Sequence, residues 1–101
     1  DINKILENLV LLHVKTQGYK AFCGVYEDKE IDFVLEKNHN KMYIQVCYLL
    51  ASKETYQREF GNLKLIQDNY PKYVVSMDPV QFDNDEGIIH LRLSDFLNTS
   101  F

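Results

Sequence analysis

The stretch that decides the fold is Glu30-Ile31-Asp32-Phe33-Val34-Leu35-Glu36, and a second segment typical of a strand follows it at Tyr43-Ile44-Gln45-Val46-Cys47. Aromatic and β-branched residues dominate both segments, as they do in the strands of a partly buried sheet. Metal-dependent chemistry on two such strands requires carboxylates and a lysine, whereas the second strand offers a glutamine and a cysteine. The fold signal is therefore stronger than the catalytic signal.

Two helices and three strands are predicted in the first two thirds of the chain. The apolar-stripe residues at helical spacing are Ile2, Ile5, Leu6, Leu9, Val10, His13 and Val14. They predict a first helix that ends before Gly18. Segments 19–26, 30–37 and 42–50 are predicted strands separated by polar turns, so we expect an antiparallel meander. Ser52 is the predicted N-cap of the second helix.

The last third of the chain contains two predicted strands, 72–77 and 88–93, and a short terminal helix that Ser94 is expected to cap. The order αβββαββα predicts an α/β fold in which helices flank a mixed central sheet. A length of 101 residues allows one core, so we expect a single domain over residues 1–101.

The composition is typical of a globular domain, with 46% hydrophobic and 26% charged residues. No apolar run approaches the roughly 20 residues that span a bilayer, and no signal peptide is recognisable, so we expect a cytoplasmic protein without membrane contacts. The chain enters helical periodicity directly at Asp1, which favours a piece of a longer protein.

The charge and the cysteines exclude several classes of site. A net charge of −4 disfavours strong non-specific nucleic-acid binding, which needs a basic surface. Cys23 and Cys47 lie in strand-like segments and are predicted to be small buried hydrophobes, since two cysteines are too few for a disulfide framework. The cations that could still form one basic face are Lys15, Lys20, Lys37, Lys41, Lys53, Arg58 and Lys64.

Six phrases in order along nearly the whole chain carry a resemblance to a known family. They are Ile5-Leu6-Glu7-Asn8-Leu9-Val10, Glu30-Ile31-Asp32-Phe33-Val34, Tyr43-Ile44-Gln45-Val46, Asp68-Asn69-Tyr70-Pro71-Lys72-Tyr73-Val74, Gly87-Ile88-Ile89-His90-Leu91 and Asp95-Phe96-Leu97. The chain resembles the C-terminal domain of unknown function that follows an AAA-type P-loop ATPase module in bacterial and archaeal ATP-binding proteins. That family is similar in topology to the PD-(D/E)XK restriction-endonuclease-like fold.

The resemblance implies where a nuclease site would lie. Glu7 matches the acidic residue of the first helix, and Asp32 matches the metal-ligating aspartate. Gln45 falls on the second acidic position and Cys47 on the catalytic lysine, so the motif is degenerate. An active enzyme would have to recruit a lysine from elsewhere, such as Lys15 or Lys29. The expected cofactor is none, or a vestigial Mg²⁺ or Mn²⁺ site at Asp32 and Glu7.

Each of these residues also has a structural alternative. Glu7 lies on the flank of the first apolar stripe, where a surface carboxylate is equally expected. Asp32 either faces solvent or has a buried partner, because aspartate is disfavoured inside a strand. Gln45 could hydrogen-bond across the sheet.

Three functions remain open from the sequence. The favoured one is a non-catalytic accessory domain that docks onto the N-terminal AAA-type ATPase module of the same chain, onto a protein partner or onto itself. The second is a nucleic-acid-binding module that has lost cleavage. The third is an active Mg²⁺-dependent nuclease, and any ATPase activity would belong to the missing P-loop module.

Overall fold

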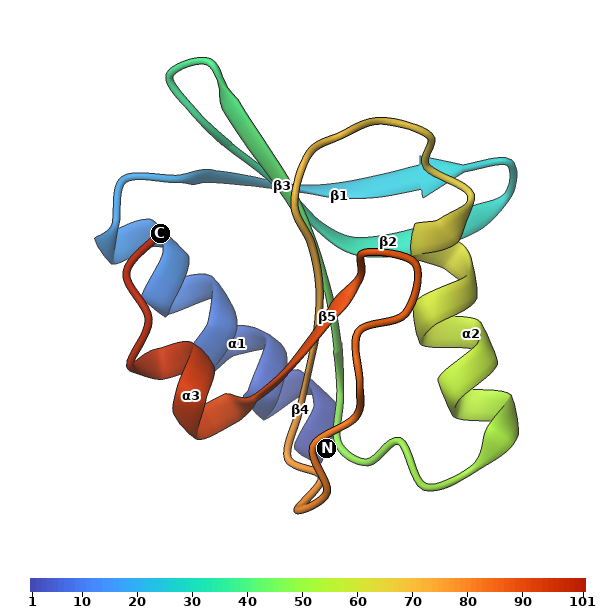
Figure 1. Cartoon of the computed structure of the whole chain (residues 1–101). Helices are drawn as coiled ribbons and strands as arrows, with labels where there is room; N and C mark the ends of the chain where they lie inside the picture. Colours follow the sequence, from blue (N-terminus) through green and yellow to red (C-terminus); the bar gives the residue numbers. More distant parts are fainter.

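The computed structural model describes all residues, 1–101, as one five-stranded sheet with helices on both faces (Figure 1). The elements are α1 (Ile2–Thr16), β1 (Lys20–Tyr26), β2 (Lys29–Lys37), β3 (Asn40–Cys47), α2 (Lys53–Lys64), β4 (Lys72–Ser76), β5 (Ile89–Arg92) and α3 (Leu93–Leu97). This confirms the predicted order and the mixed α/β architecture. None of the three helices is long and apolar enough to cross a membrane.

The strands lie in the order β1-β2-β3-β4-β5. β1, β2 and β3 pair antiparallel, which confirms the predicted meander, whereas β3, β4 and β5 pair parallel. A two-residue turn joins β1 to β2, with Glu27 at φ 48° and Asp28 at φ 66°. Positive φ at both central residues suits the right-handed twist of a hairpin. β1 and β5 are left as the two edges of the sheet.

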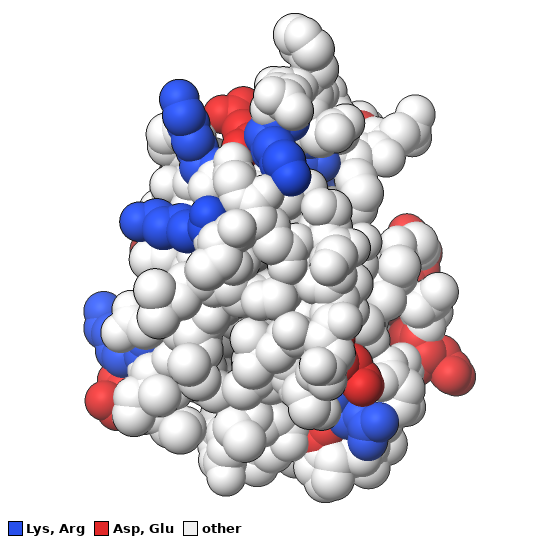
Figure 2. Space-filling view, turned by 90° about the vertical axis from the view of Figure 1, so that its left-hand side faces the viewer, with Lys and Arg blue, Asp and Glu red and all other residues white.

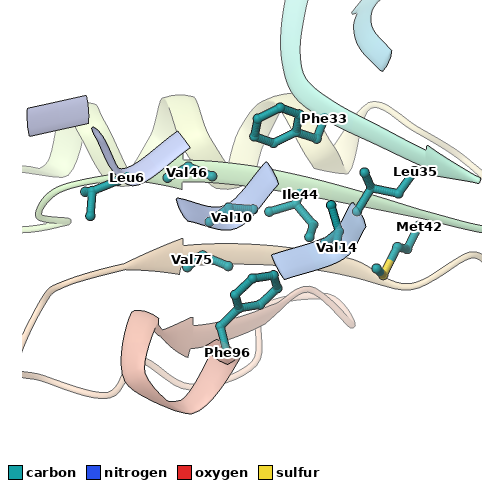
Figure 3. Packing of buried hydrophobic residues seen from close by; sticks show 10 residues of the cluster. All are labelled: Leu6, Val10, Val14, Phe33, Leu35, Met42, Ile44, Val46, Val75 and Phe96. Carbon is teal, nitrogen blue, oxygen red and sulfur yellow. The ribbon is translucent and has the colours of Figure 1, made fainter. Parts of the chain in front are cut away.

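The sheet separates two hydrophobic cores. One lies under α1 and α3, and Figure 3 shows its ten buried side chains: Leu6, Val10, Val14, Phe33, Leu35, Met42, Ile44, Val46, Val75 and Phe96. The other lies under α2 on the opposite face and contains Ile31, Tyr43, Cys47, Leu50, Phe60, Leu63, Val74 and Ile88. Side chains of β3 alternate between the two cores, as expected for a central strand.

The first helix buries less of its apolar surface than the sequence predicts. Leu6, Val10 and Val14 face the core, while Ile2, Ile5 and Leu9 are 43%, 55% and 39% exposed. A helix packed on one side of a sheet buries a stripe about 100° wide, so a wider apolar face leaves its flank in solvent. Three of the seven residues of the predicted apolar stripe therefore remain exposed.

Three local predictions also need correction. The cap of α3 is Arg92 without a side-chain hydrogen bond, because the helix begins at Leu93 immediately after β5 and includes Ser94. β3 ends at Cys47, since the next residues bend away from the sheet towards α2. Cys47 is buried as predicted, but Cys23 is exposed because it lies on the edge strand.

Candidate functional site

The candidate site lies where β2 and β3 stop pairing. Their ladder of paired residues ends at Phe33 and Ile44, and beyond it side chains link the two strands. The backbone N–H of Asp32 donates to Gln45 Oε1 at 2.7 Å, and the N–H of Val46 donates to Asp32 Oδ2 at 2.8 Å. The side chains of Asp32 and Gln45 therefore replace backbone-to-backbone hydrogen bonds at the point where β2 and β3 separate.

The side chain of Gln45 is occupied by hydrogen bonds that link β3 to β2. It is only 2% exposed, and its Nε2 also donates to the carbonyl oxygen of Glu30 at 3.4 Å. This confirms the alternative that Gln45 hydrogen-bonds across the sheet. A buried amide that loses such partners would leave polar groups unsatisfied, so turning it towards a ligand would be costly.

The environments of Asp32 and Cys47 raise the pKa values of both groups. Burial raises the pKa of Asp32, the Val46 N–H opposes this change, and the neighbouring carboxylates of Glu7 and Glu30 raise it further. Burial, followed by the carboxylate of Glu59, raises the pKa of the Cys47 thiol to about 12. Cys47 is therefore a neutral thiol at physiological pH and supplies neither a cation nor a reactive thiolate.

Glu7 and Asp32 come together around one concavity. This acidic pocket has a volume of about 330 Å³ and is lined by Lys4, Glu7, Cys23, Gly24, Val25, Glu30, Ile31 and Asp32. Gln45 and Cys47 are not among the lining residues. No three side chains of His, Cys, Asp or Glu are close enough together to hold a metal ion. Lys4 is the cation that the structure brings to the pocket, rather than the suggested Lys15 or Lys29.

Glu59 in α2 is a residue that the sequence reading missed. It is 7% exposed, its Oε1 lies 3.5 Å from Arg58 Nε, and its buried Oε2 has no hydrogen-bond partner. Burial, followed by the charge of Asp32, raises the pKa of Glu59 to about 7. Its position four residues before the core residue Leu63 was the available signal, because residues four apart share a helix face.

A second buried polar cluster lies between β4 and β5. Ser76 Oγ is 2.7 Å from His90 Nε2, and His90 Nδ1 accepts the N–H of Phe82 at 3.1 Å. Burial lowers the pKa of His90. Because Nδ1 accepts the N–H of Phe82, the neutral ring carries its proton on Nε2 and donates it to Ser76. The serine is therefore an acceptor in a structural network and is not activated as a nucleophile.

The seven cations proposed as one basic face are divided in the structure. Lys20, Lys37 and Lys41 lie at one end of the sheet, where Glu36 pairs with both Lys20 and Lys41 across the strands. Arg58 and Lys64 lie on α2 and form ion pairs with carboxylates, Arg58 with Glu59 and Lys64 with two acidic residues of the loop after β4. Figure 2 shows basic side chains gathered at the upper end of one side and a broad area without charges below them.

Comparison with known proteins finds segments of longer proteins that are similar to this chain. No protein-family model matches it. An uncharacterized protein of Haemophilus influenzae is 30% identical over 92 residues, which cover 91% of this chain and 22% of that protein. The uncharacterized protein MJ1544 of Methanocaldococcus jannaschii is 32% identical over 102 residues, which cover 91% of this chain and 21% of that protein. The chain thus spans about a fifth of the length of these bacterial and archaeal relatives.

Proposed function

We propose that this chain is a non-catalytic accessory domain that docks, through the exposed face of α1, onto another module of a longer AAA-type P-loop ATPase. The observation that carries the proposal is a row of exposed aliphatic side chains on that helix. Ile2, Ile5, Leu9 and Leu12 are 43%, 55%, 39% and 62% exposed. The fold proposed for the domain is the restriction-endonuclease-like one, with a degenerate site.

The spacing of these four residues, which we call the α1 stripe, supports a docking role. Steps of three, four and three residues keep them on one helix face, apart from the face that packs on the sheet. The largest contiguous apolar patch on a monomeric protein is often a functional interaction surface. The matched segments make up only about a fifth of the relatives, so a longer protein of that kind has further residues available to cover the stripe.

The bonds inside the degenerate motif support the absence of catalysis. Asp32 and Gln45 hold β2 and β3 together, and Cys47 is a buried neutral thiol. A phosphodiester cleavage site needs carboxylates free to hold a divalent cation and a cation that stabilises charge in the transition state. Neither requirement is met by these three residues.

Docking can be tested by hydroxyl-radical footprinting of Leu9 and Leu12, first in the isolated chain and then in the longer ATPase. We expect labelling of both side chains to fall severalfold in the longer protein, because the docked module excludes solvent. Val80, which is 60% exposed in the loop after β4, provides the control position. Equal labelling of the α1 stripe in both proteins would refute the proposed docking face.

Catalysis can be tested separately with supercoiled plasmid DNA and Mg²⁺ or Mn²⁺. We expect no cleavage by the purified chain. Metal-dependent cleavage that disappears in Asp32→Ala would overturn the non-catalytic assignment and support the nuclease instead.

Nucleic-acid binding is the second candidate, and the cations at the end of the β2–β3 hairpin favour it. Lys37 lies beside Lys20 around one concavity, and neither has a carboxylate within ion-pair distance. If they contact phosphates, binding to a short duplex should weaken with salt, and Lys37→Ala should reduce the salt dependence. No binding at low salt would exclude this candidate.

A further inference from the structure

The outer edge of β1 is free along its whole length. β1 pairs only with β2, and no hydrogen bond outside that ladder reaches residues 20–26. An edge strand presents unpaired N–H and C=O groups that can add a strand from another chain. β1 has little of the usual protection: it contains no proline, its only charged residue is Lys20 at its start, and its one irregularity is the register shift between Phe22 and Gly24. Phe22, Val25 and Tyr26 add exposed apolar surface, with Val25 73% exposed.

A pocket lies beside this edge on the face that α2 covers. This apolar pocket has a volume of about 400 Å³ and is lined by Gly24, Val25, Tyr26, Ile31, Val34, Lys41, Tyr43, Ile66, Gln67 and Asp68. Six of its ten lining residues are hydrophobic. Such a hollow suits an aliphatic or aromatic side chain.

The acidic pocket lies beside the same part of the edge, on the face that α1 covers. It shares Gly24, Val25 and Ile31 with the apolar pocket, and Glu7 reaches it from α1. Gly24 lies between the two pockets and has no side chain, and a Cβ there would lie only 2.7 Å from Val34 Cγ2. The two pockets therefore flank one short stretch of free backbone, one on each face of the sheet.

The charges of the acidic pocket define what would enter it. The charged residues that line it are three acidic ones, Glu7, Glu30 and Asp32, and one basic one, Lys4. None of these four residues forms an ion pair within the chain. A lysine or arginine side chain would therefore complement this pocket, whereas an acidic one would be repelled.

We propose that β1 binds an extended peptide segment of another protein, in which apolar residues alternate with basic ones. The added strand would pair with the free backbone of β1. Its successive side chains would point to opposite faces of the sheet, so that apolar residues enter the apolar pocket and basic residues face the acidic pocket. A second copy of β1 fits less well, because it would bring the carboxylates of two acidic pockets to one interface.

The probe for this proposal is a fluorescein-labelled peptide of seven residues that alternates valine and lysine, with acetylated and amidated ends. A peptide in which glutamate replaces lysine is its matched control. By fluorescence anisotropy we expect the lysine peptide to bind at least about tenfold more tightly than the glutamate peptide. Backbone NMR should show slowed amide exchange in β1 and shifted resonances in both pockets.

Variants of the chain change the charge of the acidic pocket and the edge strand. Glu7→Gln with Glu30→Gln should weaken binding of the lysine peptide about tenfold, and Val25→Lys should weaken it by placing a cation on the edge strand beside both pockets. Val80→Lys, a change of the same kind at an exposed site outside both pockets, should leave binding unchanged. Thermal unfolding by circular dichroism checks that each variant is folded.

Three results would overturn the proposal. They are equal affinity for the two peptides, resonance shifts on the α1 stripe instead of β1, and concentration-dependent dimerisation that Val25→Lys abolishes without any peptide binding. Because the α1 stripe and the edge of β1 are different surfaces, failure here would leave the proposed docking of α1 untouched.

Discussion

Replacing Glu59 by glutamine isolates the charge that α2 buries next to the candidate site. The carboxyl group is almost inaccessible, and its Oε2 has no hydrogen-bond donor. Burial and the charge of Asp32 raise its pKa from 4.5 to about 7. The folded protein therefore holds a proton on Glu59 under conditions in which the unfolded chain has lost it.

The sign and the size of the effect follow from linkage. The stability that Glu59 contributes is fully present below pH 4.5 and is lost as the pH rises through about 7. A pKa difference of this size corresponds to roughly 3 kcal/mol of unfolding free energy. Because glutamine has the shape of the protonated acid and does not ionise, Glu59→Gln should remove this loss. The variant should be more stable than the parent by up to about 3 kcal/mol at pH 8, and similar to it at pH 4.

Urea unfolding of both proteins at pH 4, 6 and 8 measures this difference. All other titrating groups are common to the two chains, so the pH dependence of the difference belongs to Glu59. Glu54→Gln is the control, since Glu54 is exposed in the first turn of the same helix. A stability difference that stays constant from pH 4 to pH 8 would refute the reasoning.

Three further predictions concern the cysteines, His90 and the glycines. Under native conditions a thiol reagent should label exposed Cys23 and spare buried Cys47, so mass spectrometry should find one adduct per chain, and two rapid adducts would contradict the structure. Because burial lowers the pKa of His90, stability should decrease as the pH falls below 6.5, and urea midpoints of the parent and His90→Gln at pH 5 and 7.5 test this. Gly61→Ala should stabilise the protein by about 1 kcal/mol, since Gly61 lies in a helix and an added Cβ there meets nothing within 4 Å. Gly24→Ala should destabilise the protein by about 1–3 kcal/mol, because its Cβ would contact Val34. Thermal melts that rank the two variants in the opposite order would be inconsistent with this packing.

The order and type of the elements could be predicted because each carries its own local signal. The spacing of Leu6, Val10 and Val14 and the turn at Glu27 and Asp28 are properties of short windows, and the structure confirms them. Which apolar residues remain exposed could not be predicted in this way. Leu9 and Val10 are both members of the predicted apolar stripe, and only the placement of α1 on the sheet decides which of them is buried.

The candidate site could be predicted only in part, for a similar reason. The motif identified Glu7 and Asp32, and the structure brings both to the acidic pocket. Glu59 comes from a different helix, and its proximity depends on how α2 packs against β3, which a strand motif cannot specify. Lys4 likewise reaches the pocket only because α1 packs against the sheet.

The separation of β2 and β3 links the candidate site to the free edge. Where two strands move apart, their backbone groups need other partners, and Asp32 and Gln45 supply them. The same region holds the register shift between Phe22 and Gly24, so β1 and β2 also pair irregularly beside the acidic pocket. If Asp32 supports this geometry, Asp32→Asn should keep the fold but change amide exchange at Val46, because a carboxamide is a weaker acceptor than a carboxylate. Unaltered exchange at Val46 would mean that the charge of Asp32 is not needed there and is available to a ligand.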